Sequence, residues 1–405
     1  MSEPWLAVVG IGEDGLDGLS RRARDLVDHA ALLVGGRRHL AMVPEDGRRR
    51  LTWSSPLTET LAEIAALAPC PTVVLASGDP GWFGVAKLLR QHFPDPPPLI
   101  LPAPSAFQLA AAALGWALED VTCVSLHGRP IEALHRHLAP GVRLLLLTSG
   151  RDDPLRIAAM LADLGHGATR LWVLEHLGGP RERHLEGTAA ALPLGPFADL
   201  HVLALELDHP ATSRTLPAAI GLPDEAFEHD GQLTKREIRA ATLAMLAPGV
   251  GELLWDVGAG AGSIAIEWLR AGRRCRAIAI ERDPARVERI ARNAAALGTS
   301  ELLTLLGTAP AALEGLEAPD VIFIGGGVAE NGLLASCWHR LRPGGRLVAN
   351  AVTLAGEAAL LALLAEARGQ LLRLRVERAE PVGGSLAWRP AIPVTQLVAI
   401  KQKSR

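Results

Sequence analysis

Two glycine-rich loops of different design constrain the fold of this 405-residue chain more than any other feature. The first is Gly10-Ile11-Gly12-Glu13-Asp14-Gly15, and the second is Asp256-Val257-Gly258-Ala259-Gly260-Ala261-Gly262. Each follows a short apolar run, Trp5 to Val9 or Leu253 to Trp255. Glycines at the carboxyl end of a strand let the backbone approach a ligand. We therefore expect two domains, each with its own nucleotide-type site.

Short apolar runs alternate with helix-like segments in both halves, which predicts α/β architecture throughout. In the first half the runs are Ala31 to Val34, Thr72 to Ala76, Leu99 to Leu101, Val121 to Val124, Arg143 to Leu147 and Leu171 to Leu174. In the second half, Arg276 to Ile280 predicts a strand, and a helix is expected from the N-cap Asp283 to just before Gly298. Two late runs, Leu371 to Ala379 and Val394 to Lys401, predict an antiparallel pair that closes the sheet.

The segment from Asp208 to Pro223 separates the halves, because the periodic pattern stops there and three prolines punctuate it. We expect a first domain at residues 1–209, a linker at 210–217 and a second domain at 218–405.

Composition excludes several classes of partner. The formal net charge is −3 and no long run of one sign occurs, so neither nucleic acid nor an anionic membrane is an expected partner. The four cysteines lack the spacing of metal ligands, and no targeting segment or apolar run of membrane-spanning length is evident. These features predict a cytoplasmic protein without a metal site that acts on small molecules.

The flanks of the second loop distinguish between cofactors. Asp256 ends the strand before the loop, where a carboxylate would repel a pyrophosphate and attract a sulfonium. Glu281, at the end of the next strand, is placed to accept hydrogen bonds from ribose hydroxyls. The NAD fingerprint would require glycine where the chain has Ser263. S-adenosylmethionine is therefore favoured over NAD, with a purely structural turn and a solvated strand-end acid as the alternatives.

A series of motifs in the second half keeps a specific order. Gly221 to Asp224 and His229 to Arg239 precede the Asp256 loop, and Phe323-Ile324-Gly325-Gly326-Gly327 follows it. This half resembles the CbiT-type decarboxylating methyltransferases of corrin synthesis over nearly all of residues 218–405. The resemblance implies a Rossmann-like fold that binds S-adenosylmethionine. The contacts it implies are Thr234, Asp256, Gly258, Ala259, Gly260, Ala261, Gly262, Glu281, Thr308 and Ala309, with Thr308 replacing an acidic residue that the family often has.

Two further loops in the first half accompany the first glycine loop. Ser77 to Gly84 follows one predicted strand and Pro102 to Gln108 another, so the three loops should define one cleft. Together they resemble the tetrapyrrole methyltransferases, a fold of two α/β lobes with S-adenosylmethionine between them. Ser125 to Arg129 and Leu147 to Arg151 resemble the CbiE-type C5-methyltransferases within that group. The implied cofactor contacts are Gly10, Gly12, Ser77, Gly78, Asp79, Ser105 and Ala106.

Arginines are the expected ligands of a polycarboxylate substrate, because a guanidinium can donate two parallel hydrogen bonds to a carboxylate. His127, Arg129 and Arg236 are predicted to bind substrate, although a histidine such as His127 is more often simply packed or solvated. The same logic makes candidates of Arg37, Arg38, Arg181 and Arg239. Arg286, Arg289 and Arg292, at helical spacing, are interpreted as a solvated face.

Fused in this order, the halves resemble the CobL-type C5,15-methyltransferases (decarboxylating) of cobalamin biosynthesis. The resemblance implies one S-adenosylmethionine per domain and a tetrapyrrole substrate, precorrin-6B. The first domain would methylate C5, and the second would methylate C15 and decarboxylate the C12 acetate, giving precorrin-8. A homo-oligomer is expected. No catalytic residue is predicted, because methyl transfer from a sulfonium depends mainly on alignment. The alternatives are a half that only binds the intermediate, or an NAD-dependent oxidoreductase.

Overall fold

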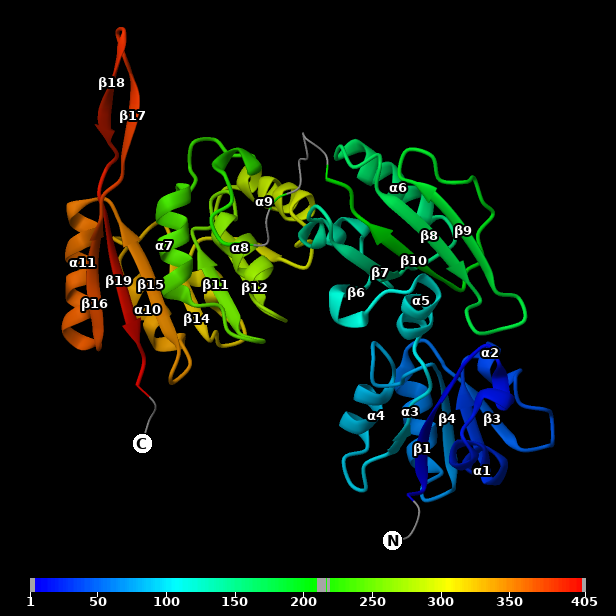
Figure 1. Ribbon diagram of the computed structural model, residues 1–405. Helices are drawn as coiled ribbons and strands as arrows, with labels where there is room; N and C mark the ends of the chain where they lie inside the picture. The colour runs from blue at the N-terminus through cyan, green and yellow to red at the C-terminus, as the bar shows by residue number, and fades with distance from the viewer. Residues whose placement is uncertain (1–3, 210–215, 217–218, 403–405) are drawn as a thin grey trace. The chain divides into compact units, whose positions relative to one another are not determined.

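The computed structural model describes residues 4–209, 216 and 219–402 (Figure 1). The chain divides into two compact units, which are described separately: residues 4–129 with 139–209, and residues 130–138 with 216 and 219–402. The predicted linker at 210–217 lies outside the described residues except for residue 216. The predicted domain boundaries therefore stay a prediction.

The first unit begins with a parallel five-stranded sheet in the order β3-β2-β4-β1-β5. Side chains of β1 enter two cores alternately, Leu6 and Val8 on one face and Ala7 and Val9 on the other, as expected of a strand covered on both faces. The strands are β1 (Leu6–Ile11), β2 (Leu32–Gly35), β3 (Arg49–Thr52), β4 (Thr72–Ser77) and β5 (Leu99–Leu101), and the helices are η1 (Gly15–Gly18), α1 (Arg21–His29), α2 (Arg37–Leu40), α3 (Leu57–Ala66) and α4 (Ala86–His92).

A second five-stranded sheet, in the order β6-β7-β10-β8-β9, completes the first unit. Only β6 and β7 run parallel in it. Its elements are α5 (Ala106–Leu114), η2 (Leu118–Asp120), β6 (Val121–Ser125), β7 (Arg143–Leu147), α6 (Asp153–Asp163), β8 (Arg170–Glu175), β9 (Arg183–Thr188) and β10 (His201–Glu206). The two α/β lobes confirm the predicted fold, and every predicted strand overlaps an observed one. The edge strands β3 and β9 were not predicted, because neither has a buried residue or an apolar run. The buried apolar strand β10 was also missed.

The second unit contains a seven-stranded sheet in the order β13-β12-β11-β14-β15-β19-β16, in which only β19 pairs antiparallel with its neighbours. This confirms the Rossmann-like fold. The strands are β11 (Leu253–Val257), β12 (Arg276–Glu281), β13 (Leu303–Leu306), β14 (Val321–Ile324), β15 (Arg346–Ala351), β16 (Gly369–Leu374) and β19 (Val394–Ile400). The helices are η3 (Ile131–His137), η4 (Asp224–Ala226), α7 (Arg236–Leu246), α8 (Ser263–Ala271), α9 (Pro284–Ala296), η5 (Ala311–Leu313), α10 (Leu333–Arg340) and α11 (Leu354–Glu366).

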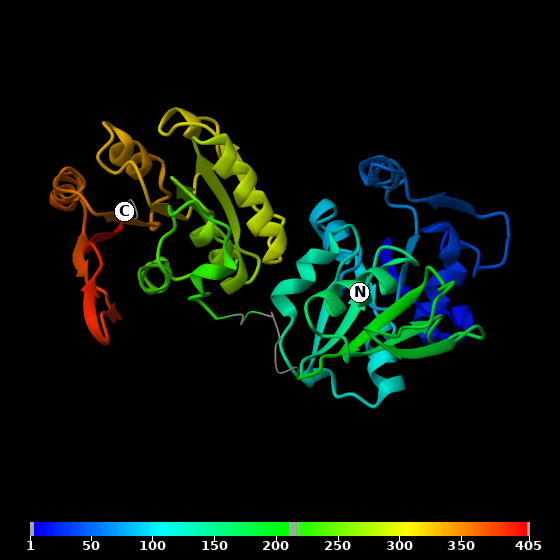
Figure 2. The ribbon, with the colours of Figure 1, turned by 90° about the horizontal axis from the view of Figure 1, so that it is seen from above.

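Helix α9 lies beside β12 and β13 (Figure 2) and has the predicted ends. The Asp283 carboxylate accepts a hydrogen bond from the backbone N–H of Ala285 at 2.9 Å, and Pro284 occupies the first turn. Gly298, just past the end, has a φ of +75°. The sequence signals for this helix are therefore confirmed.

The predicted strand Leu371 to Ala379 is wrong in its second half. β16 ends at Leu374 and pairs with β19 as expected, but the chain then forms β17 (Glu377–Val382) and β18 (Ser385–Pro390). These two strands make a separate two-stranded ribbon that projects from the sheet (Figure 1). All residues of both strands are exposed. The sequence therefore lacks the alternation of buried and exposed positions from which a strand can be predicted.

No helix among the described residues combines the length and the apolar character needed to cross a membrane.

Candidate active site

A pocket of about 550 Å³ in the second unit is the clearest candidate site. It lies at the carboxyl ends of β11, β12, β13 and β14, the edge at which open α/β sheets bind ligands. Its volume falls within the range of roughly 300–1,000 Å³ typical of small-molecule sites. Predicted contacts that line it are Thr234, Gly258, Ala259, Gly260, Glu281, Thr308 and Ala309.

Glycines in the second loop are required by the backbone. Gly258, Gly260 and Gly262 have φ values of +73°, +59° and +77°, in the left-handed region that other residues rarely adopt. A Cβ atom on Gly258 would also lie 3.1 Å from the backbone nitrogen of Gly326. Gly258 and Gly260 line the pocket, whereas Ala261 and Gly262 do not. Ala261 instead accepts a hydrogen bond from Asn293 of α9 at 3.0 Å.

Glu281 is fixed at the pocket wall. Only 4% of the residue is exposed, and its carboxylate accepts backbone hydrogen bonds from Gly260 at 2.8 Å, Arg282 at 2.9 Å and Asp283 at 3.1 Å. A carboxylate offers about four acceptor positions, so at least one stays available for a hydroxyl group. The arrangement fits the predicted ribose contact and also holds the glycine loop against β12.

Asp256 does not face the pocket, contrary to the expectation that its charge would meet the ligand. The residue is buried, and its Oδ2 accepts a hydrogen bond from the backbone N–H of Ala265 in α8 at 3.1 Å. Its Oδ1 has no hydrogen-bond partner among the described residues. Burial raises the pKa of Asp256 to about 7, and the nearby charge of Glu281 adds to the rise. Burial therefore favours the neutral, protonated form of this carboxyl group.

Arg239 has a structural role, so its candidacy as a substrate ligand is wrong. It is fully buried, with Nε 2.5 Å from Oε1 of Glu267 and Nη1 3.0 Å from Oδ1 of Asp224. It also donates to the carbonyl oxygen of Thr234 at 2.5 Å, which fixes Thr234 at the pocket wall. The other candidate on this helix, Arg236, is exposed and does not line the pocket.

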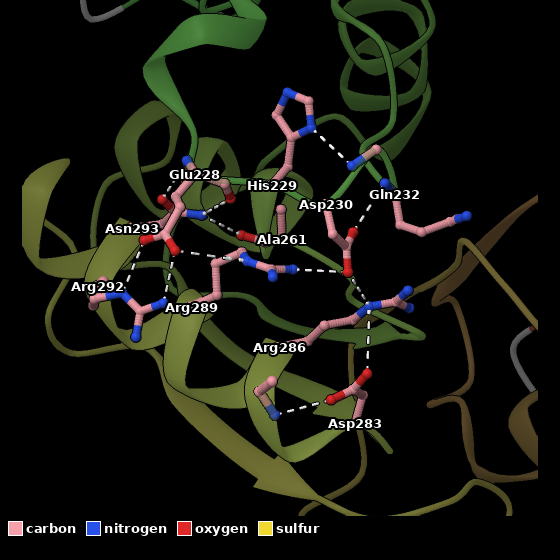
Figure 3. A network of polar contacts seen from close by, with 12 residues as sticks. Glu228, His229, Asp230, Gln232, Ala261, Asp283, Arg286, Arg289, Arg292 and Asn293 are labelled. Carbon is pink, nitrogen blue, oxygen red and sulfur yellow. Dashed lines mark hydrogen bonds and ion pairs between the residues drawn. The ribbon is translucent and has the colours of Figure 1, made fainter.

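Arg286, Arg289 and Arg292 form ion pairs rather than a merely solvated face (Figure 3). Arg286 Nε and Arg289 Nη1 lie 3.0 and 2.9 Å from Oδ2 of Asp230, and Arg292 makes two hydrogen bonds to Glu228 at 2.7 and 2.8 Å. The pKa of Asp230 is held well below its usual range by the Gln232 N–H and by these arginines. We call these five residues the α9 network.

Helix α9 also positions one wall of the pocket, through Asn293. Asn293 of α9 accepts the backbone N–H of Glu228 at 2.8 Å and donates to the carbonyl oxygens of Glu228 and Ala261, each at 3.0 Å. One helix therefore holds both the glycine loop and the segment that contains Gly231 and Gln232, which line the pocket. The helical spacing correctly predicted that the three arginines share one face of α9. It could not reveal their acidic partners, because these lie about 60 residues earlier in the chain.

In the first unit, the loops after β1, β4 and β5 meet backbone to backbone. A Cβ atom on Gly10 would lie 1.9 Å from the carbonyl oxygen of Gly78 and 2.6 Å from the nitrogen of Ala103. One on Gly78, whose φ is +52°, would lie 2.8 Å from Cα of Ser105. The three loops therefore meet as expected, whereas the cleft predicted at them stays a prediction. Gly10 and Gly78 are needed for the loops to approach one another.

Several predicted cofactor contacts in these loops also have partners within the protein. Ser105 is the N-cap of α5, its Oγ accepting the N–H of Gln108 at 3.3 Å, and Ala106 is the first residue of that helix. Asp79 accepts the N–H of Gly81 at 2.7 Å. A Cβ atom on Gly12 would lie 2.6 Å from Oδ1 of Asp14. Contacts within the protein therefore explain why some of these residues are present in each motif, without a ligand.

A polar cluster beside the first loop was missed by the sequence analysis. Glu13, with 9% of its side chain exposed, pairs with Arg38, with Nδ1 of His176 at 3.0 Å and with Nη2 of Arg181 at 3.6 Å. Ser77 Oγ accepts from Arg38 at 2.8 Å and lies 2.9 Å from Nε2 of His39. Burial and the charge of Arg38 lower the pKa of His39 to about 4. The sequence analysis named Arg38 and Arg181 as candidate ligands of substrate carboxylates, whereas in the structure both pair with Glu13.

The remaining candidates in the first unit are exposed. His127 and Arg129 lie in the loop after β6, where the N–H of Gly128 donates to Ser149 Oγ of the loop after β7 at 3.0 Å. Arg37 is exposed at the start of α2. Within residues 4–209, 216 and 219–402, no group of three or more His, Cys, Asp or Glu residues is arranged to hold a metal ion.

Comparison with known proteins agrees with both halves of the structure. A family model for tetrapyrrole (corrin/porphyrin) methylases matches residues 6–193, and one for a precorrin methyltransferase domain matches residues 225–401. A cobalt-precorrin-7 C(5)-methyltransferase of Salmonella typhimurium is 35% identical over 44% of the chain and 88% of its own length. A probable cobalt-precorrin-6B C(15)-methyltransferase (decarboxylating) of Saccharolobus solfataricus is 36% identical over 33% of the chain and 70% of its own length.

A full-length relative joins the two halves. The precorrin-6Y C(5,15)-methyltransferase (decarboxylating) of a Sinorhizobium species is 49% identical over 97% of this chain and 95% of its own length. Identity at this level over nearly the whole of both proteins establishes the family. The chain belongs to the precorrin-6Y C(5,15)-methyltransferases (decarboxylating), as the resemblance predicted.

Proposed function

We propose that this enzyme methylates precorrin-6B at C5 with its first domain and at C15 with its second, and that the second also decarboxylates the C12 acetate to give precorrin-8. The full-length relative, whose name includes both carbons and the decarboxylation, supports this proposal. The observation that carries it is the pocket of the second unit, where the Gly258 loop and Glu281 meet at one sheet edge. The family implies S-adenosylmethionine as methyl donor.

We further propose one S-adenosylmethionine per domain. In the second domain, Glu281 would accept the ribose hydroxyls, Gly258 and Gly260 would let the backbone approach, and Thr308 and Ala309 would border the adenine. The residues present fit this group, because an acidic wall and a left-handed glycine loop line one pocket of suitable volume. When bound, the cofactor supplies a methyl group on a sulfonium. Thr234, held by Arg239, would complete the wall.

The proposed site in the first domain lies at the gathered loops after β1, β4 and β5. Gly10, Gly12, Ser77, Gly78, Asp79, Ser105 and Ala106 would surround the second cofactor molecule there. His127 and Arg129 are exposed and would contact the tetrapyrrole. The chemistry of this pair is suitable, because a guanidinium and an imidazole both pair with carboxylates.

The proton balance defines what the protein must do. Each methylation replaces a ring C–H with C–CH3 and releases one proton, so alignment of donor and ring carbon is the main requirement. Decarboxylation breaks the bond between the acetate methylene and CO2, and a proton takes the place of CO2. The conjugated tetrapyrrole can accept the electron pair during that step. The protein therefore needs to hold, orient and shield the substrate.

Mass spectrometry of the product tests the division of labour. Full-length protein with precorrin-6B and S-adenosylmethionine should add two methyl groups and remove one CO2. Separate fragments 1–209 and 218–405 should divide these changes, with the second fragment adding one methyl group and removing CO2. Decarboxylation by the first fragment would overturn the assignment, and a single methylation by the full chain would favour a half that only binds the intermediate. Saturation by NAD without S-adenosylmethionine binding would favour an oxidoreductase.

A fragment can fail for a structural reason, because residues 130–138 group with the second unit. Full-length variants provide the control. A Glu281→Ala chain and a Gly78→Val chain should each be defective alone and should together restore the complete product.

We also propose a homo-oligomer, and a cytoplasmic location, which the scattered cysteines and the lack of an evident targeting segment predict. Light scattering of the purified chain and fractionation of cells test these two points, and a monomer or a membrane-bound fraction would contradict them.

A further inference from the structure

The β17–β18 ribbon reaches the mouth of the pocket through one arginine. Arg378 of β17, together with Val376 and Ile392 next to the ribbon, lines the pocket opposite Glu237 of α7. Arg378 Nη2 lies 2.5 Å from Oε2 of Glu237. Among the described residues, this is the salt bridge that joins the ribbon to the rest of the second unit.

The Arg378–Glu237 pair is well suited to exchange partners. The two side chains are 45% and 46% exposed, and exposed ion pairs contribute only about 0–1 kcal/mol of stability because water screens them. A ligand carboxylate can therefore replace Glu237 at small cost. The planar guanidinium could then donate two parallel hydrogen bonds to that carboxylate.

Exposed apolar side chains line the same pocket as this arginine. Val352 is 56% exposed and Ile392 is 72% exposed, and both line the pocket. Exposed apolar surface beside a cation matches a flat apolar ring that carries acidic side chains at its edge. The other cations of the lining are paired as well: Lys235 with Asp224 at 3.7 Å, Arg282 with Glu330 at 3.3 Å, and Arg286 with Asp230 at 3.0 Å.

We propose that Arg378 binds a carboxylate of the tetrapyrrole and that Glu237 holds Arg378 until the substrate replaces it. This inference rests on the proposed function, because the polycarboxylate substrate is the occupant. Glu237 then has two opposing effects. It keeps the guanidinium at the pocket mouth, but it also competes with the substrate and repels the incoming carboxylate.

The ribbon offers a matched control in Arg389. Arg389 lies directly opposite Arg378 in the ladder, on the same face of the ribbon, but pairs with Glu380 at 3.3 Å and does not line the pocket. Loss of Arg389 removes the same charge from the same ribbon without removing the proposed contact.

Steady-state CO2 release from precorrin-6B by full-length protein tests the proposal. Arg378→Ala should raise KM about 10-fold to 100-fold with kcat within about two-fold, the pattern of a lost binding contact. Glu237→Gln should lower KM, and Arg389→Ala should leave it within about two-fold. The affinity for S-adenosylmethionine, measured by calorimetry, should be unchanged in all three variants.

Two results would overturn the proposal. An unchanged KM in Arg378→Ala would show that this arginine does not bind the substrate. A raised KM in both Arg378→Ala and Glu237→Gln would show that the ion pair only holds the ribbon in place. If the wild-type protein releases no CO2 from precorrin-6B, the proposed function and this inference are both overturned. If wild-type turnover is normal, the KM of the Arg378→Ala variant tests the role of Arg378 alone.

Discussion

The glycines of the two units differ in how closely neighbouring backbone approaches them. In the first unit, Gly10 and Gly78 lack side chains because the backbones of neighbouring loops occupy that space. In the second unit, Gly258 and Gly260 have left-handed conformations and line a pocket. A glycine motif therefore indicates a position at which a side chain would not fit. Only the structure shows whether the space beside that glycine is filled by protein backbone or belongs to a ligand pocket.

The acids of the two loops differ in the same way. Glu13 of the first loop is buried, which raises its pKa, but its contacts with His176 and Arg38 outweigh burial and hold the pKa below the usual range. Asp256 of the second loop has one backbone hydrogen bond and no cationic partner among the described residues, so burial dominates and raises its pKa. The first acid is stabilised as an anion, whereas the second is not.

The largest expected effect separates the two loops by stability. Gly10→Ala should destabilise the first unit by roughly 3 kcal/mol or more, because the new Cβ atom would lie 1.9 Å from a backbone oxygen. Gly260→Ala should cost less, about 1–2 kcal/mol for a left-handed residue plus the small shift needed where the new Cβ would lie 3.1 Å from the carbonyl oxygen of Gln232. Gly128→Ala, with a φ of +69° and no atom within 4 Å of the new Cβ, is the control for that penalty. Thermal unfolding measures all three, and equal losses for Gly10→Ala and Gly128→Ala would contradict the comparison.

The next effect concerns the two acids of the second loop. Glu281→Ala should weaken S-adenosylmethionine binding about 10-fold to 100-fold, because a charged hydrogen bond contributes about 1.5–3 kcal/mol. Asp256→Asn keeps an acceptor for the Ala265 N–H and lies behind the pocket, so its effect should stay within a few-fold. Calorimetric titration compares them. If Asp256→Asn lost as much affinity as Glu281→Ala, the charge of Asp256 would act on the ligand directly.

Opposite pH dependence sharpens the comparison further. Because the folded pKa of Asp256 lies above its unfolded value of 3.8, folding binds a proton between pH 3.8 and about 7, and stability falls as pH rises through that window. The slope is at most about 1.4 kcal/mol per pH unit. The lowered pKa of Glu13 gives a contribution that is present above pH 4.5 and lost at lower pH.

Chemical unfolding of wild type, Asp256→Asn and Glu13→Gln from pH 3 to 8 measures these contributions. The stability of wild type relative to Asp256→Asn should fall as pH rises from 4 to 7. Relative to Glu13→Gln it should fall only as the solution is made more acidic than pH 4.5. A difference between wild type and Asp256→Asn that is constant with pH would be inconsistent with a buried, unpaired carboxyl group.

The smallest expected effect concerns the exposed ion pairs of the α9 network. Arg292→Ala removes an exposed pair with Glu228 and should cost about 0.2–1 kcal/mol. Asn293→Ala removes three hydrogen bonds that fix Glu228 and Ala261, and should cost more and weaken cofactor binding. Unfolding and titration of both variants test the ranking, and a reversed order would assign the positioning role to the arginine.

Local signals predicted most of the fold. Buried strands such as β4 and β7 contain runs of four apolar residues, and α9 has an N-cap, a first-turn proline and a final glycine. These signals all act within a few residues. The β17–β18 ribbon was missed because no residue of its strands is buried. Its role at the pocket mouth depends on Glu237, 141 residues away from Arg378.

The candidate site was predicted less completely, because side-chain direction is not local. Glu281 was placed correctly from its position at a strand end, whereas Asp256 at a similar position faces α8. The sequence made Arg239 a candidate substrate ligand. In the structure Arg239 instead donates to the buried Glu267, which lies 28 residues later in the chain. Long-range pairing of charged groups is the information that sequence spacing lacks.

Calorimetric titration of the full-length chain with S-adenosylmethionine tests the central claim of two cofactor sites most directly. We predict two equivalents per chain for wild type and one remaining equivalent of unchanged affinity for Glu281→Ala. A single equivalent in the wild-type chain, or the loss of both in Glu281→Ala, would contradict the account of two independent methyltransferase sites.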